Sequence, residues 1–143
     1  MMRNGYTRIG FILSLAAAFG LGYTAYVQYR IAQINSVITT TVTGAQKAAR
    51  AAGKMKEDGN GTIKLAKVAE LEAKGWVLSD DNQSYELKEE GKVHASMTLD
   101  HKTGKVVYKI DCGSFSDGLA QQECSDALDG TGKNYVDTND VPW

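Results

Sequence analysis

The segment that decides the fold is FILSLAAAFGLGYTAYVQYR, residues 11–30, which follows MMRNGYTRIG at residues 1–10. No charged residue occurs from Ile9 to Gln28, and Arg8 and Arg30 flank this apolar run. A helix needs about 20 apolar residues to cross the hydrocarbon core of a bilayer. The run therefore predicts a retained helix that spans a membrane over residues 11–29.

A cleaved secretory signal peptide is the competing interpretation of the same run. Its cleavage site has small residues at the last and third-last positions. The best cleavage position here follows Ala25, which places the bulky Tyr23 at the third-last position. We therefore favour a helix that stays in the mature protein.

The helical pattern continues beyond the apolar run. Apolar residues that step by three and four form one stripe of a helix, at Ile31, Ile34, Ile38, Val42, Ala45, Ala49 and Ala52. β-Branched residues at 37–43 predict a soft spot, and Gly59 and Gly61 predict the end of the helix. A helix over residues 11–58 is about 70 Å long, so a small head covers only its C-terminal half.

Residues 62–143 are expected to form this head. A second helix is predicted from Thr62 to a stop at Gly75. Alternating apolar residues then predict antiparallel strands over 76–79, 84–88, 92–99 and 105–111, with His94 on the solvent face of its strand. Residues 126–143 are expected to be loop-like. The fold class is therefore α+β, with a long N-terminal helix packed on a sheet of three or four strands.

The two cysteines, Cys112 and Cys124, lie close together in the sequence. Structural zinc needs four ligands and this stretch supplies two, so a disulfide is the better interpretation, with two unrelated buried thiols as the alternative. A disulfide that closes such a loop stabilises a small domain by about 3 kcal/mol and requires an oxidising compartment. It would place the head outside the cytoplasm and the N-terminus inside.

Charge and motif content argue against several functional classes. Residues 1–61 carry seven basic and two acidic side chains, whereas residues 62–143 carry nine and fifteen, so we expect no nucleic-acid contact by the head. His94 and His101 do not form a convincing metal pair. Carboxylates in the tail could surround calcium but lack EF-hand spacing, at Asp126, Asp129, Asp137 and Asp140. We expect no enzyme activity, cofactor or metal.

The combination of these features resembles the type IV pilins and the pilin-like proteins of type II secretion systems. The shared features are a short basic leader, a glycine before an aromatic residue, a long apolar helix, an antiparallel sheet and a C-terminal disulfide loop. The pattern Leu65…Leu71…Gly75-Trp76 and the placement of the cysteines are closer to the type IVb pilins. As architecture, the resemblance extends over nearly the whole chain.

The resemblance implies removal of a leader by a prepilin peptidase, which cuts after a glycine and methylates the new N-terminal residue. Cleavage after Gly10 would begin the mature chain at Phe11, and cleavage after Gly5 would begin it at Tyr6. We favour Gly10, and thus a leader of residues 1–10, because the other site would keep Arg8 in the apolar segment, where a charge is costly to bury.

The resemblance also implies that the N-terminal helix forms a filament core, with Phe11, Leu13, Leu15, Phe19, Leu21, Tyr23 and Tyr26 as its residues. The family carries a glutamate at the fifth mature position, which pairs with a neighbour's N-terminal amine. This chain has Leu15 there, or Gly10 for the earlier cleavage site. The difference indicates a minor subunit or another solution to packing.

The predicted function is a structural subunit of a type IV pilus-like filament, in adhesion, motility, DNA uptake or secretion. Its partners would be copies of itself or other pilins, the prepilin peptidase, and the inner membrane before assembly. The head would be periplasmic at first and then extracellular. Two alternatives are a monomeric, membrane-anchored periplasmic binding module and, less favoured, a secreted domain.

Overall fold

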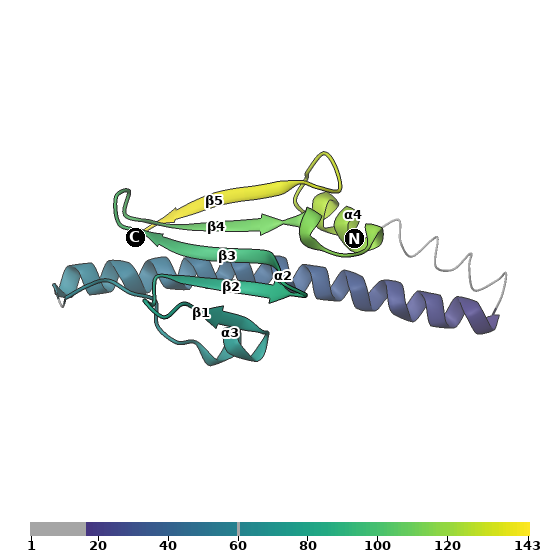
Figure 1. Ribbon diagram of the computed structural model, residues 1–143, viewed down its shortest axis with the longest axis horizontal. Coiled ribbons are helices and arrows are strands. Elements are labelled where there is room, and N and C mark those ends of the chain that lie inside the picture. The colour runs from purple at the N-terminus through teal and green to yellow at the C-terminus, as the bar shows by residue number, and fades with distance from the viewer. Residues whose placement is uncertain (1–16, 60) are drawn as a thin grey trace.

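The computed structural model describes residues 17–59 and 61–143, with side chains described from Gly22 onward. A single long helix, α2 (Ala17–Asp58), runs along the length of the molecule, and a twisted sheet lies along it (Figure 1). The expected class, a long N-terminal helix on an antiparallel sheet, is confirmed. The leader, residues 1–10, lies outside the described residues.

One face of α2 is buried, at Val27, Ile34, Thr41, Ala45, Ala49 and Ala52. The predicted stripe is confirmed at four of these positions, but Thr41 replaces Val42 as the buried residue. The Thr41 hydroxyl donates a hydrogen bond to the Val37 carbonyl at 2.6 Å, which satisfies this polar group inside the core. The helix continues unbroken through the predicted soft spot at residues 37–44.

The C-terminal end of α2 agrees with the prediction. The helix ends at Asp58, and Gly59 follows with a positive φ of 68°. The Gly59 amide donates to the Met55 carbonyl at 3.0 Å. A glycine in the left-handed conformation with this bond is a common helix terminator.

Within the described residues the sheet has five antiparallel strands in the order β1-β2-β3-β4-β5. Their bounds are Trp76–Leu78, Ser84–Glu89, Lys92–Asp100, Lys105–Asp111 and Val136–Pro142. The expectation of three or four strands was wrong, because β5 forms in the predicted loop and pairs with β4 along its whole length. Most of β5 is exposed, so its sequence lacks the apolar alternation by which strands are recognised.

The predicted helix from Thr62 is also mostly wrong, since only α3 (Ala69–Ala73) is helical. The preceding backbone bonds to the sheet instead. Leu65 donates its amide to the Asn82 carbonyl at 2.7 Å, and the Tyr85 hydroxyl accepts from the Val68 amide at 2.9 Å. The same hydroxyl donates to the Ala66 carbonyl at 3.0 Å. These tertiary bonds replace the helical ones and override local propensity.

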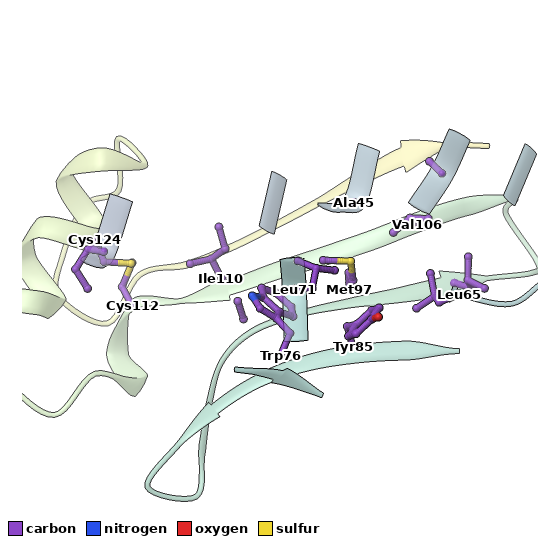
Figure 2. Close-up of a cluster of buried hydrophobic side chains, with 14 of the residues drawn as sticks. Ala45, Leu65, Leu71, Trp76, Tyr85, Met97, Val106, Ile110, Cys112 and Cys124 are labelled. Atoms are coloured by element: carbon purple, nitrogen blue, oxygen red, sulfur yellow. A yellow bond between two sulfur atoms is a disulfide. The ribbon is translucent and has the colours of Figure 1, made fainter. Parts of the chain in front are cut away.

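The core lies between α2, the segment before α3 and one face of the sheet. Figure 2 shows Leu65, Leu71, Trp76, Tyr85 and Met97 together in this layer, with Ala45, Val106 and Ile110 beside them. The predicted inward positions of β3 and β4 include Met97, Leu99, Val106 and Ile110, and all four are buried.

The predicted disulfide between Cys112 and Cys124 is present. It joins the short helix η1 (Cys112–Ser114), at the end of β4, to α4 (Gly118–Ala127). Asp117 caps α4 by accepting a hydrogen bond from the Ala120 amide at 2.6 Å, and aspartate is one of the preferred residues at this position of a helix. The disulfide therefore holds α4 against the end of the sheet that lies nearer the N-terminus of α2 (Figure 1).

Candidate assembly surface

The first described turns of α2 extend beyond the sheet and α4 (Figure 1). Three tyrosines lie on this part of the helix: Tyr23 is 51% exposed, Tyr26 46% and Tyr29 63%. Residues three apart are neighbours on a helix surface, so the three side chains form one patch. We call Tyr23, Tyr26 and Tyr29 the tyrosine patch.

The structure describes only some of the other residues predicted for the filament core and the cleavage sites. Phe19 and Leu21 lie in α2, but the described side chains begin at Gly22. The remaining residues lie outside the described part of the chain: Phe11, Leu13 and Leu15 of the core, and Gly5, Tyr6, Gly10 and Phe11 of the two cleavage sites.

The tyrosine patch ends where α2 is tied to the head. Arg30 Nη2 donates to Asp117 Oδ2 at 2.8 Å, and the two side chains are 13% and 35% exposed. Arg30 Nη1 also donates to the Gln33 side chain. Because the other Asp117 oxygen caps α4, one carboxylate fixes both the start of α4 and its position on α2.

This ion pair was not predicted. The sequence indicated Arg30 only as the charged flank of an apolar run, and the partner lies 87 residues further along the chain. No local pattern in either segment identifies the other, so only the tertiary fold brings them together.

A groove of about 360 Å³ begins beside the tyrosine patch. It runs along α2 from Tyr29 to Thr40, past Ala32, Gln33, Ser36 and Val37. The remaining lining comes from the head, at Lys74, Trp76, Leu87, Glu89, His94 and Phe115. A second, smaller cavity of about 210 Å³ lies between α2 and the segment 64–71. Both cavities are lined mostly by apolar groups, which suits hydrophobic contacts with another molecule better than catalysis.

His94 was expected to face solvent, and this was wrong. A β-bulge lies here, because Leu87 pairs with Ala95 while Lys88 pairs with Val93, leaving His94 as the extra residue. A bulge turns successive side chains to the same face, so His94 and Ala95 are both buried. The imidazole stacks on Phe115, with ring centroids 4.2 Å apart, and its Nδ1 lies 2.6 Å from Ser114 Oγ.

The pKa of the His94 imidazole is lower than the ordinary value for histidine. Burial lowers its pKa, and the nearby carboxylate of Glu89, 3.7 Å from Nε2, opposes this shift. The charge of Arg30 lowers the pKa further, whereas Asp111 raises it slightly. A buried neutral histidine of this kind makes folding sensitive to acid.

The remaining polar residues named from the sequence do not converge. His101 lies in the exposed β3–β4 turn against Trp143 and contacts the Gln83 side chain. Asp140 pairs with Lys105 on the neighbouring strand, and Asp126 accepts from Gln122. Over residues 17–59 and 61–143, no group of three or more His, Cys, Asp or Glu side chains is arranged to hold a metal ion.

The predicted membrane span, residues 11–29, lies partly before the described residues. In the portion of the chain that the structure describes, no helix contains a window apolar enough to cross a membrane.

Comparison with protein-family models, with curated proteins and with solved structures gives no significant match. The function is therefore inferred from the arrangement of the residues themselves.

Substitutions at Asp117 separate its two contacts. Asp117→Asn keeps a good cap but removes the negative charge opposite the nearly buried Arg30, whereas Asp117→Ala removes both. We expect both variants to lower the free energy of unfolding, with Ala lower than Asn by about 1 kcal/mol. Urea unfolding of the two variants checks this, and equal midpoints for wild type and Asp117→Asn would show that the ion pair contributes nothing.

Acidification is expected to destabilise the protein through His94. Its folded-state pKa is lowered, so the unfolded chain binds more protons and stability falls as the pH drops below the unfolded pKa of about 6.5. Unfolding free energies measured between neutral and mildly acidic pH should show a slope that His94→Asn reduces. The control His101→Asn, at an exposed histidine, should keep the slope, and an unchanged slope in His94→Asn contradicts the prediction.

Proposed function

We propose that this chain is a subunit of a type IV pilus-like filament, which polymerises through its N-terminal helix and leaves the head exposed. The observation that carries the proposal is that α2 continues past the head and presents the tyrosine patch there. A helix that leaves its own domain with large side chains uncovered needs a partner surface.

The chemistry of the patch supports a protein partner. Tyrosine is enriched at protein interfaces because its ring buries a large apolar area while the hydroxyl still finds a hydrogen bond. In the sequence, Tyr23 and Tyr26 lie within the uncharged run Ile9–Gln28, and Tyr29 directly follows it. The proposed surface therefore comprises residues 11–29, which would lie in the inner membrane before assembly and against neighbouring helices afterwards.

The groove beside Tyr29 extends this surface onto the head. Its apolar walls, from Val37 on α2 to Trp76 and Leu87 on the sheet, could receive side chains of an adjacent subunit. A contact that uses both the helix and the head would fix the rotation between neighbouring subunits, because two separate contacts define an orientation better than one.

The disulfide is consistent with a head that folds outside the cytoplasm, as the proposed function requires. Cys112 and Cys124 are fully buried and paired, and such bonds persist in oxidising compartments. The head would fold in the periplasm, with the N-terminus in the cytoplasm, and would then move outward with the filament. Leu15, at the position of the family's glutamate, leads us to favour a minor subunit.

The alternative is a monomeric binding module that stays anchored in the inner membrane. The two apolar hollows, of about 360 and 210 Å³, favour this second function, since cavities of this kind accommodate small ligands. The two proposals differ in the fate of the N-terminus, because a permanent anchor keeps its leader.

Mass spectrometry of the native chain, recovered from membranes and from sheared surface filaments, tests the proposal. We expect a mature form that begins at methylated Phe11, present in the filament fraction. Replacing Gly10 by valine should block processing and remove the chain from this fraction, whereas the matched control Gly5→Val should leave both unchanged.

The other outcomes have distinct meanings. An intact Met1 found only in the inner membrane supports the anchored binding module and contradicts the filament proposal. A start near Tyr26 supports a secreted domain. A start at Tyr6, reversed by Gly5→Val, keeps the proposal but moves the cleavage site.

A further inference from the structure

The cavity of about 210 Å³ between α2 and the segment 64–71 has two walls of different character. The wall on the side of the head consists of buried core residues, which Figure 2 shows in one layer: Leu65, Leu71, Tyr85 and Met97. The facing wall on α2 includes Gly44, Ala48 and Ala51. Because these α2 residues have small side chains or none, the space between the walls is not filled.

Met97 brings a flexible side chain to this cavity. A Cβ at Gly44 would lie 2.8 Å from the Met97 methyl carbon, so the methyl group lies directly against α2. Methionine is unbranched and adapts to irregular gaps. The Met97 methyl can therefore move to accommodate an occupant, and it reports on one.

The hydroxyl groups in the lining already have partners. The Tyr85 hydroxyl donates to the Ala66 carbonyl at 3.0 Å and accepts from the Val68 amide at 2.9 Å. Thr40 and Thr43 donate to carbonyls one turn earlier in α2. An apolar cavity whose polar groups are satisfied holds water poorly and accepts apolar molecules. The interior therefore suits a hydrocarbon group.

The charged side chains in the lining are Lys47, Lys64 and Glu70. Lys47 Nζ lies 4.0 Å from Glu70 Oε2, so these two charges offset each other. Lys64 takes part in no ion pair among the described residues. The lining thus carries one net positive charge, and Lys64 supplies it on the exposed segment that covers the cavity.

From these observations we infer that the cavity binds a medium-chain carboxylate, with its hydrocarbon tail between α2 and the segment 64–71 and its carboxylate on Lys64. A dry cavity of about 150 Å³ holds a benzene molecule, so a cavity of about 210 Å³ admits a chain of about eight carbons. The charge of Lys64 selects an acid over an alcohol or an amine of the same length.

This inference goes beyond the proposed function. The cavity lies within one copy of the chain, so a filament subunit and an anchored module would both contain it. The identity of the mature N-terminus has no bearing on it, and each proposal can fail without the other.

Titration of the full chain in lipid nanodiscs with octanoate, followed by NMR of ¹³C-methyl-labelled methionine, tests the site. We expect a saturable shift of the Met97 methyl signal, with the signal of Met55, which does not line the cavity, unchanged. Octan-1-ol should bind about fivefold more weakly than octanoate because it lacks the charge. Octylammonium should bind more weakly still.

Two matched variants test the role of the charge. Lys64→Gln should lower the affinity for octanoate by about fivefold and leave that for octan-1-ol unchanged. The control Lys67→Gln lies on the same segment but outside the lining, where Lys67 pairs with Glu72 at 3.6 Å, and it should bind octanoate like the wild type. Both positions are exposed, so the fold should not depend on either side chain.

Several results would overturn the inference. One is a Met97 signal that does not respond to octanoate, or that moves together with Met55 without saturation. Others are octylammonium binding as tight as that of octanoate, or Lys64→Gln binding octanoate like the wild type. An affinity that keeps rising from octanoate to dodecanoate would indicate adsorption on a surface instead, and a response to lysophospholipid alone would assign the cavity to a lipid tail.

Discussion

The rest of the structure depends on a mismatch in length between α2 and the sheet that covers it. At 1.5 Å per residue, the 42 residues of α2 extend for about 63 Å. The longest strand, β3, has nine residues and extends for about 30 Å. The sheet therefore buries only part of the helix, and the remaining turns must be covered by another element, another molecule or lipid.

The boundary between the covered and the uncovered helix is set by α4. The disulfide fixes α4 at the end of β4, and Asp117 fixes it on Arg30. Among the side chains described, from Gly22 onward, Val27 is the buried one nearest the N-terminus, whereas Tyr23 and Tyr26 beyond it are exposed. A polar contact thus marks the end of the folded head, and a surface of aromatic residues begins within one turn of it.

Local patterns in the sequence correctly predicted the features that depend on residues close together in the chain. The end of α2 at Asp58, the alternation of β3 and β4, and the pairing of Cys112 with Cys124 are all confirmed. The predictions failed where contacts between residues far apart in the sequence determine the structure. The β5 strand depends on its ladder with β4, the segment before α3 bonds to Tyr85, and a bulge turns His94 inward. The Arg30–Asp117 pair joins segments too far apart in sequence for either to predict the other.

Hydroxyl-radical footprinting of the full chain, dispersed and assembled, addresses the assembly role of the uncovered helix most directly. Tyr23, Tyr26 and Tyr29 are exposed in the single chain, so they should be oxidised readily when it is dispersed. If the N-terminal part of α2 is the assembly surface, all three should become strongly protected in the assembled state relative to exposed Val77 on the head. Equal oxidation of the tyrosines in both states would contradict this role.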